Sequence, residues 1–174
     1  MRKKIQPSSK VIMPGGKLFT GTFKPHVFPD GFCMVVDTRE QKPLFTPPEK
    51  GLMVKTDTLH NGDYSILGFE DQFAVERKGI SDFLGYISHE RKRTVEKMKR
   101  LTQYAFKALV IESGEDELFF GSMYSKVSVE VIRAAQVSFQ VRYGVHLFIS
   151  ADRSKIERVI LDWAIKYYLI KKEV

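Results

Sequence analysis

The sequence predicts an α/β domain in which a mixed β-sheet is flanked by helices. In the second half of the chain, short apolar runs alternate with longer segments of helical periodicity, and this alternation favours parallel strands. In the first half, two apolar segments flank Gly68 and predict a β-hairpin, whose strands pair antiparallel. The length of 174 residues suits one ordinary domain.

Turn and cap residues divide the chain into these elements. The pair Asn61-Gly62 is a strong turn signal before the hairpin. Ser81 is a possible N-cap of the first helix, and Gly144 is a plausible stop for the third. Strands are expected at 32–36, from 52–54 onward, and at 64–67, 72–75, 108–112 and 145–149. Helices are expected at 82–87, 91–106, 127–142 and 154–170.

Composition narrows the class of protein. The net charge of +7 and the pI of about 9.4 favour an acidic partner, most commonly nucleic acid. The single Cys33 excludes an internal disulfide. No run approaches the roughly 18 apolar residues of a membrane span, and the start of the chain lacks the apolar stretch of a secretion signal. We therefore expect an intracellular protein, in the cytoplasm or nucleus, with no membrane partner.

Residues 1–31 differ from the rest of the chain. They contain six basic residues against one acid, and eight residues that are proline or glycine. This composition predicts a flexible N-terminal arm followed by one domain over 32–174. The arm is either a disordered leader or a basic segment that lies along a phosphate backbone.

The chemistry is expected where the hairpin begins and ends. Side chains alternate between the faces of a strand, so Glu76 and Lys78 point the same way and Arg77 points the other way. The hairpin turn brings Asp63 toward Glu76. Paired carboxylates suit Mg²⁺, which polarises a phosphoryl group, and a lysine beside them can hold the attacking water. The alternative is an ordinary surface ion pair.

Three motifs in these segments resemble those of the XPF-type structure-specific endonucleases, a branch of the PD-(D/E)XK nucleases. Residues 36–40 (Val-Asp-Thr-Arg-Glu) are similar to the first motif and residues 62–64 (Gly-Asp-Tyr) to the second. Residues 75–78 (Val-Glu-Arg-Lys), together with Asp82, are similar to the third, which is the most specific. The resemblance covers about residues 32–170.

The resemblance implies a restriction-endonuclease-like core and a set of residue roles. Asp63 and Glu76 would bind the metal with the carbonyl of Arg77, and Lys78 would position the attacking water. Asp37 would lie beside the metal and reach a second ion. The implied cofactor is Mg²⁺, with Mn²⁺ as a substitute, and the implied products are 5′-phosphate and 3′-hydroxyl ends. The residues expected to shape the site are Arg39, Glu40 and Asp82, and two of the motif residues, Arg39 and Arg77, are also expected to contact DNA.

A basic helix follows the third motif. Arg93, Lys97 and Arg100 share one helix face, which either contacts phosphates or is merely solvated. Lys97 stands where the family often has glutamine. Larger relatives add a helix-hairpin-helix module that is absent from this sequence, so DNA contacts are expected from the domain itself. The predicted DNA-binding residues of this segment are Arg91, Lys92, Arg93, Lys97 and Arg100.

The last helix has two apolar stripes, one through Ile156, Ile160 and Trp163 and one through Leu161 and Tyr168. Either the helix is buried on two sides within its own domain, or the C-terminal helices form the interface of a homodimer or heterodimer. The second interpretation also follows from the resemblance.

The favoured function is a metal-dependent DNA endonuclease, acting on branched or flapped DNA in repair or recombination. The alternative is a non-catalytic DNA-binding or scaffold subunit of a nuclease complex. Since Asp37, Asp63, Glu76 and Lys78 are all present, the sequence favours the enzyme. An RNA-binding module has only the net charge in its favour.

Overall fold

The computed structural model describes residues 11–12, 18–19, 24–120 and 127–173. Most of the predicted arm therefore lies outside the described residues. Within it, β1 (Val11–Ile12) and β2 (Leu18–Phe19) pair antiparallel with each other.

A mixed six-stranded sheet forms the centre of the domain, in the order β4-β3-β5-β6-β7-β8. Three neighbouring pairs are parallel, namely β3 with β4, β6 with β7 and β7 with β8, whereas β5 runs antiparallel to both β3 and β6. The prediction of a mixed sheet is thus confirmed. The strand bounds are β3 Cys33–Asp37, β4 Met53–Asp57, β5 Tyr64–Ile66, β6 Phe73–Gly79, β7 Phe106–Glu112 and β8 His146–Ser150.

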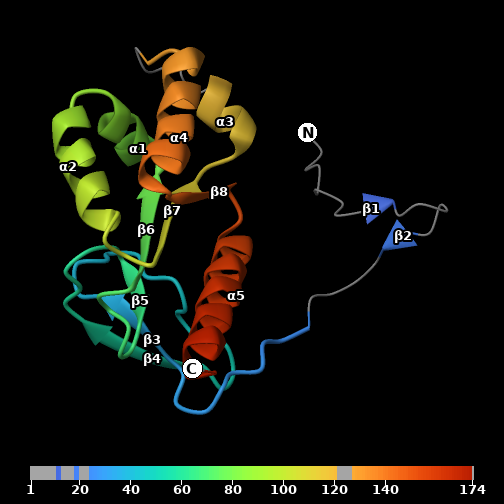
Figure 1. Ribbon diagram of the computed structural model, residues 1–174. Coiled ribbons are helices and arrows are strands. Elements are labelled where there is room, and N and C mark those ends of the chain that lie inside the picture. The colour runs from blue at the N-terminus through green and yellow to red at the C-terminus, as the bar shows by residue number, and fades with distance from the viewer. Residues whose placement is uncertain (1–10, 13–17, 20–23, 121–126, 174) are drawn as a thin grey trace.

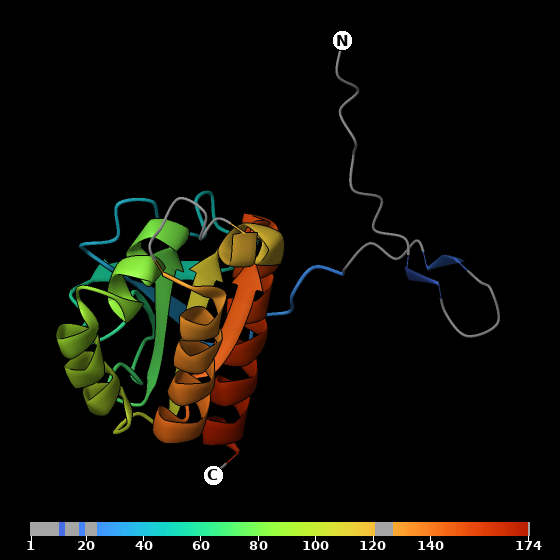
Figure 2. The same cartoon turned by 90° about the horizontal axis from the view of Figure 1, so that it is seen from above.

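Helices cover both faces of the sheet, which confirms the α/β class (Figures 1 and 2). On one face, α5 packs against β3, β5, β6 and β7. On the other face lie the remaining helices, which build a second core with β7. None of the described helices is both long and apolar enough to cross a membrane. The helix bounds are α1 Ile80–Ile87, α2 Arg91–Leu101, α3 Glu115–Phe120, α4 Val129–Tyr143 and α5 Arg153–Lys172.

Strand β6 separates the two cores through the alternation of its side chains. Phe73 and Val75 are buried against the α5 side, and Ala74 is buried against the opposite helices. Continuing this alternation, Glu76 falls on the side of α1 and α2, and Arg77 falls on the side of α5. The position of the candidate site is therefore fixed by the register of one strand.

Two helix ends and one additional helix differ from the sequence predictions. Ser81 is not the N-cap of α1, because the helix begins at Ile80 and Gly79 is its N-cap, with no side-chain hydrogen bond. Helix α2 ends at Leu101 rather than 106, because Phe106 enters β7 and stacks on Phe73 at 4.7 Å. Helix α3 was not predicted. The predicted stop at Gly144 is confirmed, with φ of 65° in the left-handed region.

Residues 24–31, which we expected to belong to the arm, contact the domain. The His26 ring lies between Glu49 Oε2 at 2.7 Å and Asp162 Oδ1 at 3.1 Å, so it joins the segment to α5. The Tyr168 hydroxyl donates to the carbonyl of Asp30 at 3.0 Å. The domain contacts thus begin well before residue 32, because these polar groups find partners on α5.

Both apolar stripes of α5 face their own domain. The buried residues of the helix come from both stripes, and Leu169 and Ile170 are its only exposed large apolar residues among those described. This packing favours the interpretation of a helix buried on two sides by its own sheet and by the segments at 28–32 and 44–52. The buried residues are Ile156, Ile160, Leu161, Ala164 and Tyr168.

Candidate active site

A close backbone contact at Gly62 positions Asp63. Gly62 has φ of +81°, and a Cβ atom there would lie 3.0 Å from the carbonyl oxygen of Val75. The Asp63 amide donates to that same oxygen at 2.8 Å. In return, the Arg77 amide donates to Asp63 Oδ2 at 2.7 Å. These bonds hold the Asp63 carboxylate against β6 between Val75 and Arg77, beside Glu76.

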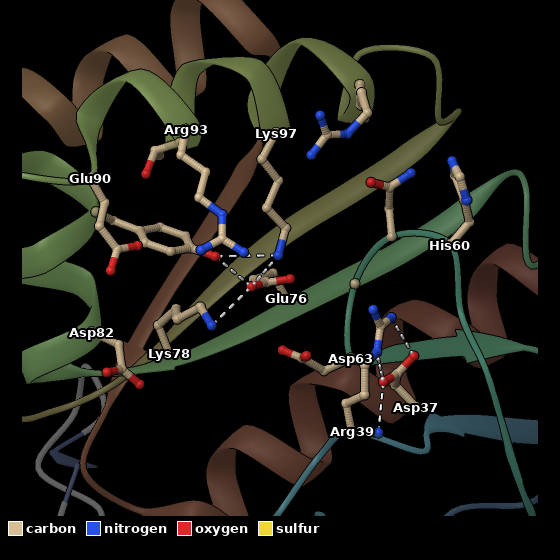
Figure 3. Close-up of a pocket in the computed structure, with 15 residues that line it drawn as sticks. Asp37, Arg39, His60, Asp63, Glu76, Lys78, Asp82, Glu90, Arg93 and Lys97 are labelled. Carbon is tan, nitrogen blue, oxygen red and sulfur yellow. Dashed lines mark hydrogen bonds and ion pairs between the residues drawn. The ribbon is translucent and has the colours of Figure 1, made fainter.

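Glu76 lies at the centre of the site and is only 1% exposed. Figure 3 shows Lys78 and Lys97 pointing toward its carboxylate from two different elements. The carboxylate oxygen Oε2 of Glu76 is buried and has no hydrogen-bond partner among the described residues. Three donors converge on Oε1: Lys97 Nζ at 2.6 Å, the Tyr86 hydroxyl at 2.9 Å and Lys78 Nζ at 3.2 Å.

Burial and charge act on the two carboxylates in different ways. Burial and the negative charge of Glu76 raise the pKa of Asp63 to about 7. Burial by itself would also raise the pKa of Glu76, but the positive charges of Lys97 and Lys78 hold it below its usual value. Glu76 is therefore ionised at neutral pH, and Asp63 carries a proton for part of the time unless a cation arrives.

Tyr86 is a member of the site that the sequence did not reveal. It reaches Glu76 from α1, and the Lys78 ammonium lies 5.0 Å from the centre of its ring. Burial and the charge of Glu76 raise the pKa of Tyr86, so its hydroxyl remains a donor. Its spacing of eight residues from Lys78 is the only signal, and an aromatic residue on a short helix is normally assigned to the core.

Asp37 lies at the cavity, but its oxygens already have partners. Arg39 donates to it from its amide at 2.8 Å and from its guanidinium at 2.7 and 2.8 Å, and the Leu59 amide donates at 2.8 Å. The Arg39 bonds hold the pKa of Asp37 down at about 2. Across the part of the chain that the structure describes, no group of three or more His, Cys, Asp or Glu residues is arranged to hold a metal. Asp37 thus lines the same cavity as Asp63 and Glu76 but is bonded to Arg39, and its expected role as a further metal ligand stays a prediction.

Arg77, which was expected to contact DNA, points away from the cavity over Glu76 and is paired with glutamates. Its side chain is 11% exposed and is bonded to Glu40 at 2.8 Å and to Glu112. Arg153 of α5 reaches the same Glu112 at 3.1 Å. Since every one of these groups lies on the α5 side of the sheet, Arg77 is a structural ion-pair residue, and Glu40 supports the site by holding it.

A cavity of about 500 Å³ opens over the carboxylates between β6 and α2. The face of α2 that lines it carries Arg93, Lys97 and Arg100, as the helical spacing predicted. Arg91 and Lys92 are exposed but do not line the cavity, because they project from other faces of the helix. Lys97 differs from its neighbours, since its ammonium is bonded to Glu76 and not left for a phosphate. The cavity is also lined by Asp37, Arg39, His60, Asn61 and Asp82.

The donor set fits a divalent cation. Glu76 Oε2 is a buried oxygen without a partner, and the raised pKa of Asp63 reports negative charge that lacks compensation. Carboxylate oxygens are ligands that Mg²⁺ and Mn²⁺ accept. Among the described residues that line the cavity, His60 is the only histidine and there is no cysteine.

Comparisons with known proteins identify the family and the fold. The family model of the ERCC4 domain matches residues 36–162. Among solved structures, XPF from Aeropyrum pernix in complex with DNA is 27% identical, with a TM-score of 0.61 over 80% of this chain and 65% of that chain. A second structure of XPF from Aeropyrum pernix is also 27% identical, with a TM-score of 0.57 over 75% of this chain and 59% of that one. The chain thus spans less than two thirds of either archaeal chain. No curated protein matches the sequence.

Proposed function

Since the chain belongs to the ERCC4 domain family, of XPF-type nucleases, we propose that it is a metal-dependent DNA endonuclease that hydrolyses phosphodiester bonds. The observation that carries the proposal is the buried, unpartnered Oε2 of Glu76 beside the carboxylate of Asp63. These two residues would hold Mg²⁺, or Mn²⁺ in its place, together with the carbonyl of Arg77. The bound ion would polarise the phosphoryl group and help to ionise the attacking water.

The residues around the carboxylates have separate roles in this proposal. Lys78 is held above its usual pKa by Glu76 and Asp63, although burial acts in the opposite direction, so it stays an ammonium. In that form it orients the attacking water and offsets negative charge on the phosphate in the transition state. Asp37 holds Arg39 at the rim of the cavity, and it would bind a metal only after the Arg39 side chain moves away. Asp82 lines the same cavity beside Lys78.

The DNA backbone would lie along the cavity face of α2. Arg93 and Arg100 are exposed there, on the same side as the carboxylates. Contacts from such residues set affinity and register, whereas they do not read sequence. We further propose branched or flapped DNA as the substrate, with 5′-phosphate and 3′-hydroxyl products and an intracellular role in repair or recombination.

The C-terminal helices are proposed to bind a second subunit, either an identical chain or a related one. Support comes from α4 and not from the buried stripes of α5. Val137 and Val141 of α4 are exposed, and β8 is an edge strand of the sheet. A monomeric mass at micromolar concentration would contradict this proposal. If the mass is dimeric, Val141→Glu should reduce it to that of one chain.

Cleavage assays test the catalytic proposal. Labelled linear, flapped, forked and four-way DNA is incubated with Mg²⁺, Mn²⁺ or EDTA. Wild type should cut only with metal, Asp63→Ala and Glu76→Ala should lose cutting while remaining folded, and Lys78→Ala should be severely impaired. The matched control is Asp71→Ala, an exposed carboxylate outside the cavity over Glu76.

Two outcomes would count against the proposal. Full activity in the Asp63 or Glu76 variant would show that the site is elsewhere. Tight DNA binding without cutting under any metal would instead support a non-catalytic DNA-binding subunit. The ion pairs of Glu76 with Lys78 and Lys97 are the observation that favours this second candidate, because they compensate the carboxylate without a metal.

A further inference from the structure

Lys97 is placed where a positive charge meets the proposed metal ligand. It comes from α2, its side chain is 24% exposed, and its ammonium lies 2.6 Å from Glu76 Oε1. The same ammonium lies 3.2 Å from the Tyr86 hydroxyl. The contact between Lys97 and Glu76 is the shortest of the three donor contacts on Glu76 Oε1.

Positive charge already surrounds Glu76 before a metal binds. Lys78 and Lys97 place two ammonium groups on one carboxylate oxygen. Asp63 supplies at most one further negative charge, and it is not bonded to either lysine. Since like charges repel strongly where water is largely excluded, each ammonium opposes the entry of a divalent cation.

The two lysines differ in how much Glu76 depends on them. If Lys97 is replaced by a neutral residue, Glu76 Oε1 still accepts hydrogen bonds from Tyr86 at 2.9 Å and from Lys78 at 3.2 Å. These two contacts still hold the carboxylate in place at the cavity. Loss of the Lys97 charge therefore removes repulsion toward a metal without removing the ligand.

We propose that Lys97 is a resident cation that competes with the divalent metal for Glu76 and so weakens metal binding by this chain. The inference rests on the proposed function, because it takes Glu76 as a metal ligand. Lys97 acts here as a positioning residue that works through Glu76.

The test measures Mn²⁺ binding directly, without DNA and without any measure of cleavage. Free Mn²⁺ is followed by electron paramagnetic resonance during titration of wild type, Lys97→Gln and Lys97→Arg. We expect Lys97→Gln to bind Mn²⁺ about tenfold more tightly than wild type, from the removal of one unit charge near the ion. Lys97→Arg, which retains the charge, should bind as weakly as wild type.

Lys99→Gln is the matched control. Lys99 lies on the same helix and loses the same charge, but it is exposed and paired with Glu96 rather than Glu76. It should leave Mn²⁺ affinity at the wild-type value. Lys97→Met provides a second neutral variant if Lys97→Gln does not give the wild-type circular dichroism spectrum.

Each outcome has a distinct meaning. Equal Mn²⁺ affinity in Lys97→Gln and wild type, or weaker binding in the variant, would overturn the inference and leave Lys97 as a support that keeps Glu76 ionised. A Glu76→Ala arm separates the two proposals. If that variant binds Mn²⁺ as well as wild type, the proposed metal site itself fails, whereas loss of binding there leaves the Lys97 comparison decisive.

Discussion

Replacing Asp63 by asparagine should stabilise the metal-free protein, and more so at pH 8 than at pH 5. The folded protein raises the pKa of Asp63 from 3.8 to about 7, first through burial and then through the charge of Glu76. Because the folded state binds this proton more tightly than the unfolded state does, wild type loses stability as pH rises from about 4 through 7. Asparagine keeps the acceptor for the Arg77 amide but has no charge to bury.

The magnitude follows from the shift. Each pKa unit corresponds to about 1.4 kcal/mol, and only the part of the transition between pH 5 and pH 8 contributes to the comparison. The stabilising effect of Asp63→Asn should therefore grow by about 2.6 kcal/mol between these two pH values. Urea unfolding in EDTA at both pH values measures it, with the exposed Asp71→Asn as control. An effect that is constant with pH, or that shrinks as pH rises, would refute the conclusion that burial raises the pKa of Asp63.

Three further changes test other parts of the molecule. Arg77→Met should lower the free energy of unfolding by about 3 kcal/mol, because it leaves the buried Glu40 without a cation, whereas Glu112 keeps Arg153, and urea unfolding checks it. Arg93→Ala and Arg100→Ala should each reduce the salt slope of DNA binding by about one, and binding titrations over a salt series should show a smaller change for Arg91→Ala. An equal change for Arg91→Ala would contradict the cavity face as the DNA contact. Gly62→Ala should lower the free energy of unfolding by about 2 kcal/mol and impair cleavage, because its Cβ would press on the strand that holds the site. Wild-type stability and activity in this variant would show that the backbone relaxes freely.

Much of the fold was predictable because its signals are local. The apolar runs and turn residues gave the six strands of the central sheet and four of the five helices of the described chain. Alternation along β6 placed Glu76 and Lys78 on one face and Arg77 on the other, and the structure agrees. The error at the end of α2 has a cause that is not local. Periodicity continued α2 past Leu101, because only the pairing of Phe106 with Phe73 shows that the strand has begun.

The partners of individual site residues were not predictable in the same way. The family resemblance led us to expect Arg77 as a DNA contact, but Glu40 and Glu112 lie 37 and 35 residues away and hold it on the α5 side. Lys97 was assigned to phosphate on its helical spacing, although α2 folds over β6 and brings its ammonium to Glu76 across 21 residues. Likewise, no pattern in the sequence ties Tyr86 to that carboxylate.

The sequence by itself determined which residue types meet at the end of the hairpin, since strand alternation and the hairpin turn around Gly68 bring Asp63 to Glu76. Only the tertiary structure decided how charge is shared there. It directs Lys97 to Glu76, leaves one Glu76 oxygen without a partner, and binds Asp37 to Arg39. The physical reason is that periodicity fixes the direction of a side chain within its own element, whereas its partner and its burial depend on how separate elements pack.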